Sequence, residues 1–325
     1  MERGFKNSDI GGFNANGFKM KFDKGGVINP FVDWGFKYLF GTERSKKNLL
    51  GFLNLLLELE HPIVDLRYLN NESIPTDKDG RECIFDILCE DCRGDKYLIE
   101  VQNARIGYIR NRMVYYACRL IDRMGQTGDD WDYNIKKVFS ICIMNFAYEA
   151  NPVLRRDFML CEPNTENLLS DRLHFIMLQL PCLDVNDFDA CDFFYEKLLY
   201  LLIQMKKGMK TIEELKQEVY AHGLNDEIRE VFLGVLEDAN VASLSEPERE
   251  LYEAKLKRYR DNRACLDYAI EDGILQGIEK GREEGIAEGE AKSKLEIARS
   301  MKNKGLDFAL IAECTGLSVE EIEKI

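Results

Sequence analysis

Two acidic residues, Asp86 and Glu100, lie in neighbouring segments whose sequences are typical of β-strands. The segments 83–90 and 96–102 flank a turn sequence at Arg93-Gly94, which predicts an antiparallel hairpin. In such a ladder the residue numbers of two paired positions always add up to the same value, so this turn places Asp86 opposite Glu100. Like charges in opposed positions destabilise a strand pair unless a cation lies between them. The spacing therefore predicts a divalent metal site, and the alternative is two solvated acids on an exposed face.

The chemistry of such a site follows from its oxygen donors. Strand alternation places Gln102 on the same face as Asp86 and Glu100. Mg²⁺ typically takes one or two protein carboxylates and completes its shell with waters and substrate phosphate oxygens. The residues thus predict a site for Mg²⁺ or Mn²⁺.

The segments around the hairpin predict a sheet with helices on its faces. Apolar residues recur at helical spacing over 33–40 and 49–57, with a break at 41–45. A short strand over 63–69 and a turn over 76–80 lead into the hairpin. A helix over 109–123, strands over 136–146 and 174–180, and helices over 187–207, 211–222 and 226–238 follow it. This order predicts an α/β fold with a mixed β-sheet flanked by helices.

Several short segments resemble one nuclease family. Phe85-Asp86 with residues 99–102 (IEVQ) resembles the D…ExK core of the PD-(D/E)xK, restriction-endonuclease-like fold. Upstream, residues 32–41 (VDWGFKYLFG) are similar to the opening D-x-x-F-K-x-L-F-G of the recombination-promoting nuclease/transposase family (Rpn). Near the end, residues 315–322 (TGLSVEEI) resemble that family's closing T-G-L-S-x-E-E-I. The resemblance covers nearly everything after residue 28 and implies a PD-(D/E)xK core with a helical C-terminal extension.

The resemblance implies a metal-dependent DNA endonuclease in which Asp86 and Glu100 bind the metal ion. The ion would lower the pKa of a bound water and neutralise charge on the phosphodiester that is hydrolysed. Asp33 would approach the site from the side, although an Asp here also suits the N-cap of a helix beginning at Trp34. Gln102 stands where the parent fold has a lysine. Its amide can orient a water but supplies no positive charge to the transition state. The candidates for that charge, each alternatively a solvated surface cation, are Lys37, Arg81 and Arg105.

The helix over 109–123 follows the hairpin and carries cationic and aromatic residues. We expect Arg112 and Tyr115 to contact DNA phosphates and bases beside the site, since stacking and cationic side chains are the usual means. The alternative is a core helix, because Met113, Tyr116 and Leu120 have helical spacing.

A second function stays open at this stage. Gln102 and the formal net charge of -14 also suit a catalytically weak or inactive nuclease-fold protein that acts as a DNA-binding or assembly module. That charge argues against broad nonspecific nucleic-acid binding, because phosphate affinity comes from neutralising cations. Any contact with DNA must then be local or assisted by a metal ion.

The chain divides into three predicted regions. Residues 1–26, rich in Gly and Asn, form a flexible arm; 27–240 form the nuclease-like domain; 241–325 form a charged helical tail. In the tail, glycines at 273, 277, 281, 285 and 289 suggest either a partner helix, hence a possible homo-oligomer, or a flexible connector. The last twenty residues have a helix-turn-helix outline, with Ser318 as N-cap. The acidic residues of its second helix favour packing or dimerisation over DNA reading.

The composition also bears on location. The sequence contains no apolar run of the roughly 18 residues needed to span a bilayer and no apolar signal core, so we expect a cytoplasmic protein without a membrane partner. The ten cysteines are scattered and predicted to be reduced. Cys89 and Cys92 form a lone C-x-x-C, for which a hairpin turn is preferred over a zinc site.

Overall fold

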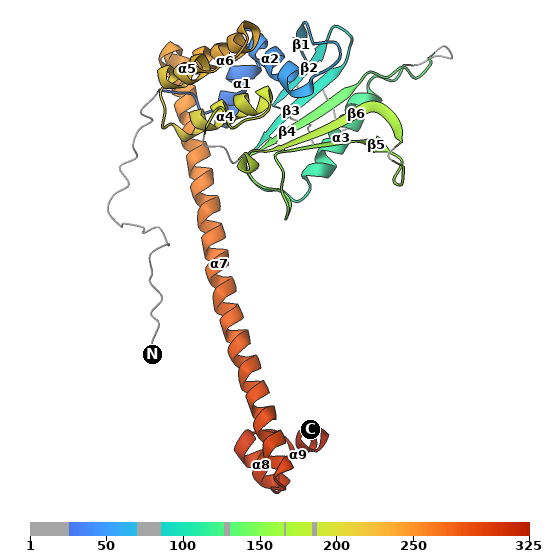
Figure 1. Cartoon of the computed structure of the whole chain (residues 1–325), viewed down its shortest axis with the longest axis vertical. Coiled ribbons are helices and arrows are strands. Elements are labelled where there is room, and N and C mark those ends of the chain that lie inside the picture. Colours follow the sequence, from blue (N-terminus) through green and yellow to red (C-terminus); the bar gives the residue numbers. More distant parts are fainter. Residues whose placement is uncertain (1–25, 70–85, 127–130, 166, 184–186) are drawn as a thin grey trace. The chain divides into compact units, whose positions relative to one another are not determined.

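The computed structural model describes residues 26–69, 86–126, 131–165, 167–183 and 187–325. Two compact units are present, one ending at Leu256 and the other running from Lys257 to Ile325. Residues 1–25 of the predicted arm and the predicted turn over 76–80 lie outside the described ranges. The first unit is a mixed sheet flanked by helices, which confirms the predicted fold class (Figure 1).

Six described strands form one sheet in the order β1-β2-β3-β4-β6-β5. Their bounds are β1 Leu66–Tyr68, β2 Ile87–Asp91, β3 Lys96–Gln102, β4 Val138–Met144, β5 Arg155–Cys161 and β6 Leu168–Gln179. β3, β4 and β6 run parallel, and the remaining neighbours pair antiparallel. Parallel neighbours need a crossover, which helix α3 (Ile109–Asp122) supplies between β3 and β4.

The hairpin formed by β2 and β3 has the predicted register. Ile87 pairs with Ile99 and Leu88 with Leu98, so Asp86, one residue before β2, lies in line with Glu100. The predicted alternation is also confirmed, because the two isoleucines and the two leucines belong to hydrophobic clusters on opposite faces of the sheet.

Helices cover both faces of this sheet (Figure 1). The largest hydrophobic cluster joins one sheet face to α1 (Asp33–Phe40), α2 (Lys46–Leu57), α4 (Phe194–Lys207), α5 (Ile212–Ala221) and α6 (Asp226–Asp238). Two smaller clusters join the other face to α3. Burial on both faces explains the continuous apolar sequence of β4.

Helix α1 is fixed by close packing at its start. A Cβ atom at Gly35 would lie 2.2 Å from the backbone oxygen of Asn29, so only glycine fits at this position without displacement. The helix is therefore held against the segment that precedes it.

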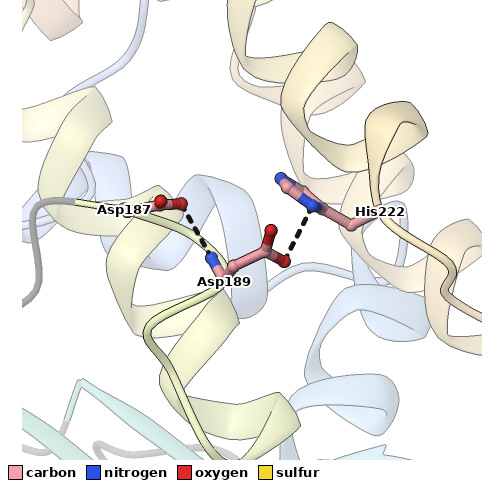
Figure 2. Close-up of side chains that lie close together, drawn as sticks. All are labelled: Asp187, Asp189 and His222. Carbon is pink, nitrogen blue, oxygen red and sulfur yellow. Dashed lines mark hydrogen bonds and ion pairs between the residues drawn. The ribbon is translucent and has the colours of Figure 1, made fainter.

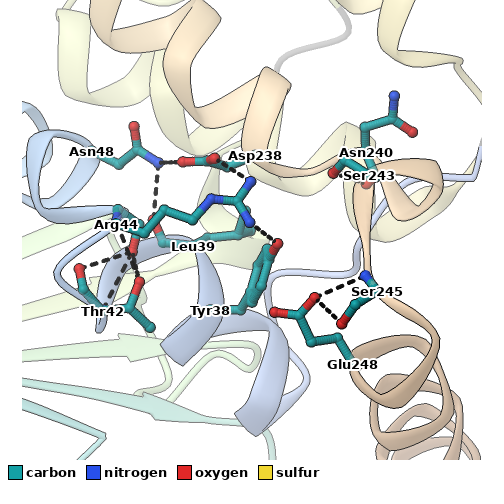
Figure 3. Close-up of polar contacts among 11 residues, drawn as sticks. Tyr38, Leu39, Thr42, Arg44, Asn48, Asp238, Asn240, Ser243, Ser245 and Glu248 are labelled. Carbon is teal, nitrogen blue, oxygen red and sulfur yellow. Dashed lines mark hydrogen bonds and ion pairs between the residues drawn. The ribbon is translucent and has the colours of Figure 1, made fainter.

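A polar network near the end of α1 ties it to α6 (Figure 3). The Arg44 guanidinium donates to the Tyr38 hydroxyl and, at 3.0 Å, to the Asp238 carboxylate. The side-chain amide of Asn48 donates to Asp238 at 2.8 Å and to the Leu39 carbonyl at 3.1 Å. Both ends of α1 are thus anchored.

The entry and exit of the nuclease-like region pair with each other. Val27 and Asn240 form an isolated antiparallel bridge. The Ile28 amide donates to the Ala239 carbonyl at 2.8 Å, and the Val241 amide donates to the Gly26 carbonyl at 2.7 Å. The predicted start of this region at residue 27 therefore meets its predicted end at 240.

The C-terminal unit consists of helices. Helix α7 (Glu246–Asn303) begins before the unit and is followed by α8 (Phe308–Thr315) and α9 (Val319–Lys324). Gly316 between the last two has φ +72°, and the Ser318 hydroxyl accepts the Glu321 amide, as expected of an N-cap. The helix-turn-helix outline is thus confirmed.

No described residue packs against the glycine repeat of α7. Cβ atoms at its five glycines would meet nothing within 4 Å. The adjacent apolar side chains are exposed as well, with Ile274, Ile278 and Ile286 each more than half accessible. This face of α7 has no intramolecular partner among the described residues.

Three elements differ from the sequence predictions. Strand β6 begins at Leu168 rather than at residue 174, because its first part pairs with β5. Strand β5 was not expected, and its residues are mostly exposed, without the alternation that marks a half-buried strand. Helix α4 begins at Phe194 rather than at Asp187, because residues 187–193 precede its first turn as bends and turns.

Two further observations concern the membrane and the cysteines. In the described ranges, no helix combines the length and apolarity that crossing a bilayer requires. The described cysteines are free. Cys89 is buried in β2 and Cys92 is exposed in the turn, as the hairpin interpretation requires.

Candidate active site

Asp86 is held against the strand that carries Glu100. Its carboxylate Oδ2 accepts the backbone N–H of Val101 at 2.6 Å. Glu100 and Gln102 are the residues directly before and after Val101 on strand β3. The hairpin therefore brings the two predicted metal ligands to one end of the β2–β3 pair.

Helix α1 contributes a cation and a third carboxylate. Lys37 Nζ lies 2.7 Å from Asp33 Oδ1, one helical turn away, and 3.9 Å from Asp86 Oδ1. Asp33 is the first residue of α1; Val32 is the N-cap and no side chain caps this end. The N-cap interpretation of Asp33 is wrong, and the residue instead lies beside Lys37 and Asp86.

Glu100 is buried, and only one of its two carboxylate oxygens has a hydrogen-bond partner among the described residues. The side chain of Arg112 on α3 donates from Nη2 to Glu100 Oε1 at 2.6 Å. The second oxygen, Oε2, is buried without a hydrogen-bond partner among the described residues. Unsatisfied buried polar atoms are rare in folded proteins and call for an explanation.

Burial raises the pKa of both carboxyl groups. It raises the pKa of Asp86 to about 6, although the Val101 amide and Lys37 act in the opposite direction and Asp33 adds to the rise. It also raises the pKa of Glu100; Arg112 opposes this shift, and the charge of Asp86 adds to it. The site therefore places negative charge where burial disfavours it.

These residues fit a divalent metal ion. They offer carboxylate oxygens, one of them buried and unpaired, in a region that gains from added positive charge. In the part of the chain that is described, only Asp187, Asp189 and His222 bring three potential ligand atoms within 4.8 Å of one another. Asp33, Asp86 and Glu100 do not meet that limit, so the fit is to an ion held by two carboxylates.

The other predicted site residues lie at varying positions. Gln102 ends β3, and its backbone carbonyl accepts the Asn145 amide at 2.9 Å. Arg105 donates to the Tyr148 carbonyl at 2.8 Å, which occupies it away from the two carboxylates. Tyr115 is exposed on the outer side of α3. Arg81 lies outside the described residues.

Sequence reasoning missed a polar chain at the same edge of the sheet. Lys206 Nζ on α4 donates to Asn145 Oδ1 at 3.1 Å, and the Asn145 amide group donates to Asn103 Oδ1. Asn103 and Asn145 directly follow β3 and β4, which are parallel strands. The carboxyl ends of parallel strands meet at one edge, so these two asparagines were a usable signal. Lys206 lies far away in sequence and left none.

Helix α3 has one face packed in the core and another that carries exposed and site-facing residues, so features of both predictions for it are present. Met113 and Leu120 are buried against the sheet, while Tyr115 is about half exposed and Arg112 reaches Glu100. The helix therefore contributes both to the core and to the edge of the site.

Comparison with protein families identifies the chain. Residues 30–269 match the family described as PD-(D/E)XK nuclease family transposase. The chain belongs to this family. Residues 291–325 match the C-terminal HTH domain of the Rpn/YhgA-like nuclease family, so the resemblance to Rpn is confirmed. No curated protein and no solved structure matches the chain.

The two family matches bear on the predictions differently. The nuclease match includes Asp33, Asp86 and Glu100 and supports a nuclease-related function. The HTH match covers α8 and α9, and this class of domain suggests DNA binding. It therefore counts against the preference for a packing role that the acidic second helix had suggested.

Proposed function

We propose that this protein is a metal-dependent DNA endonuclease that hydrolyses phosphodiester bonds, related to the recombination-promoting nucleases of mobile elements. The observation that carries the proposal is Glu100, whose Oε1 is held by Arg112 while its buried Oε2 has no partner among the described residues. An unpaired buried oxygen costs stability, and a cation bound beside Asp86 would offset this cost.

Asp86 and Glu100 would hold the metal ion, Mg²⁺ or Mn²⁺. When bound, the ion supplies an activated water and charge neutralisation at the phosphate. Arg112 keeps Glu100 in place and ionised, and the Val101 amide does the same for Asp86. The protein thus contacts Asp86 through both carboxylate oxygens and Glu100 through one.

Lys37 would supply the positive charge that Gln102 lacks. Its ammonium group lies 3.9 Å from Asp86 and is steered by Asp33 at 2.7 Å. From there it can donate to a phosphate oxygen as negative charge develops. Gln102, a neutral donor and acceptor, would orient the attacking water.

DNA would be bound by two parts of the chain. Tyr115, exposed on α3 about one turn after Arg112, offers a stacking surface, and the HTH segment offers a second contact. The net charge of -14 restricts binding to such local surfaces. The open glycine and isoleucine face of α7 would join two copies of the chain, and we expect the protein to act in the cytoplasm.

A second function is favoured by two specific observations. Gln102 replaces the lysine of the parent fold, and Arg112 already neutralises Glu100. A protein with these features could retain the nuclease fold as a DNA-binding or assembly module with little or no activity.

Plasmid nicking and calorimetry together distinguish these functions. We expect the wild type to nick supercoiled DNA with Mg²⁺ or Mn²⁺ and to bind Mn²⁺ at Asp86 and Glu100, and we expect Asp86→Asn and Glu100→Gln to lose the nicking and the Mn²⁺ bound at these two residues. Asp226→Asn, at an exposed position of α6, is the matched control and should behave like the wild type. A wild type that does not nick DNA and binds no more Mn²⁺ than the Asp86→Asn and Glu100→Gln variants would favour the second function over the first. Equal nicking by all four proteins would refute the assignment of Asp86 and Glu100.

A further inference from the structure

A second set of potential ligands lies away from the candidate active site. Asp187 and Asp189 precede α4, and His222 follows α5 (Figure 2). One ligand atom of each lies within 4.8 Å of the other two. We propose that these three residues bind a divalent transition-metal ion at a site separate from Asp86 and Glu100.

The turn before α4 brings the two carboxylates to the same side. The Asp189 amide donates to Asp187 Oδ1 at 2.9 Å, which closes the turn over the intervening residue. That residue, Phe188, is buried, while both aspartates are exposed. The buried ring thus anchors the segment and leaves both acids facing outward.

The imidazole of His222 is held in a defined orientation. Its Nδ1 lies 2.8 Å from Asp189 Oδ1, and its ring stacks on Phe188 with centroids 4.9 Å apart and planes 17° apart. Phe188 in turn packs edge-on against Phe232 and Tyr200. Orientation of a histidine ring by its surroundings is a regular feature of metal sites.

The local charge also favours a cation. Two carboxylates lie close together, and no lysine or arginine of the described chain forms an ion pair with either Asp187 or Asp189. The nearby Lys197 ammonium group instead donates to the Phe188 carbonyl at 2.8 Å. The only ion-pair partner of Asp189 in these ranges is His222, whose neutral form is a metal ligand. A divalent ion would offset the repulsion between the two acids.

The donor set indicates the class of ion. One imidazole nitrogen and two carboxylate oxygens suit Zn²⁺, Mn²⁺ and related ions better than Ca²⁺, which prefers oxygen alone. Ligands at about 2.0–2.2 Å from a metal lie closer together than 4.8 Å, so the exposed aspartate side chains would rotate inward on binding. The ion would join the turn before α4 to the end of α5.

Histidine NMR can test this site residue by residue, because the chain contains only three histidines. They are His61, His174 and His222. The probe is Mn²⁺, which broadens nearby signals and competes less for the exposed thiols than Zn²⁺ does. The starting protein is the full chain carrying Asp86→Asn and Glu100→Gln, so that the candidate active site does not bind the probe.

We expect the His222 ring signal, assigned by its loss in His222→Gln, to broaden at Mn²⁺ concentrations that leave the other two histidine signals unchanged. Adding Asp189→Asn or Asp187→Asn should weaken this effect at least about tenfold, since loss of even a supporting contact costs about that much. The added control, Asp226→Asn, should leave it unchanged.

Uniform broadening of all three signals would overturn the proposal. So would selective broadening of His222 that persists unchanged in both the Asp187→Asn and Asp189→Asn proteins. Either result would leave the contact between His222 and Asp189 as an interaction of these two side chains without a metal ion. Unchanged signals of His61 and His174 in the metal-free variants show that the fold is intact.

Discussion

The two compact units place their functional groups in opposite surroundings. In the first unit, Asp86 and Glu100 are largely withdrawn from water and each contacts a donor that fixes its position. In the second, α7 carries glycines with nothing within 4 Å and isoleucines that are open to solvent. Burial holds the two carboxylates of the first unit in fixed positions, whereas the exposed side chains of α7 remain accessible to a binding partner. Substitutions in the first unit should therefore change rate and stability, and substitutions in the second should change assembly.

The largest effect is expected at Glu100. Glu100→Gln keeps the shape of the side chain but removes the charge that binds the metal ion, so nicking should fall by about 10³-fold. Initial rates of plasmid nicking at saturating Mg²⁺ measure this effect. A rate within about threefold of the wild type would mean that the buried carboxylate is not part of the reaction.

A smaller loss is expected at Lys37. Lys37→Met removes the cation 3.9 Å from Asp86 and should lower nicking by about 10²-fold, while Lys37→Arg should recover part of the rate. Lys47→Met, an exposed lysine of α2, is the control. If both methionine variants match the wild type, a different cation replaces the missing lysine.

A pH-dependent difference in stability is expected for Asp86→Asn. Burial raises the pKa of Asp86 from 3.8 to about 6, so its protonated form stabilises the fold below about pH 4, and this contribution is lost as the pH rises through about 6. At 1.36 kcal/mol per pKa unit, the metal-free variant should be more stable than the wild type by up to about 3 kcal/mol near pH 7.5. Urea denaturation in EDTA measures the difference, which should vanish near pH 3.5. A difference that does not change with pH would contradict the prediction.

Gly35→Ala should destabilise the first unit through packing alone. Its new methyl group would overlap the Asn29 carbonyl, and relieving such an overlap typically costs about 1–3 kcal/mol. Gly223→Ala, where a Cβ atom meets nothing within 4 Å, is the matched control. Thermal denaturation of both variants should show a lower midpoint for Gly35→Ala only.

The smallest effect on catalysis is expected in the second unit. Ile278→Glu places a charge on the open face of α7 and should reduce a homo-oligomer to smaller species, while nicking stays within about twofold. Light scattering measures the mass, with Glu279→Gln as the control. An unchanged mass would show that this face does not join two copies, and a large loss of nicking would show that the units are not functionally separate.

The hairpin could be predicted because its signals are local. Alternating residues and the Arg93-Gly94 turn set both the faces and the register of β2 and β3, which the pairing of Ile87 with Ile99 confirms. The same register places Asp86 in line with Glu100, whereas the hydrogen bond from the Val101 amide to Asp86 was not predicted. Local periodicity likewise sufficed for α1, α2, α3 and α6, whose buried residues recur at helical spacing.

The parts that were missed depend on distant or weak signals. Strand β5 lies at the sheet edge with mostly exposed side chains, so no burial constrains its sequence to alternate. The contact of Lys206 with Asn145 joins residues 61 positions apart, which no sequence window contains. The Arg112 contact with Glu100 depends on how α3 is rotated about its axis against the sheet. Residue spacing alone does not predict this rotation.

The bridge between Val27 and Asn240 has a consequence for how this protein can be rearranged. Because its two ends are paired, the nuclease-like region begins and ends at neighbouring positions, and Tyr252 of α7 also packs there, with its hydroxyl accepting the Asn29 amide at 2.8 Å. Another chain could receive it there without stretching, and new ends could be opened in a surface loop once the old ones are joined. Such topology suits a region that is transferred between proteins as a unit, and that unit would have to include α7 as far as the buried Tyr252.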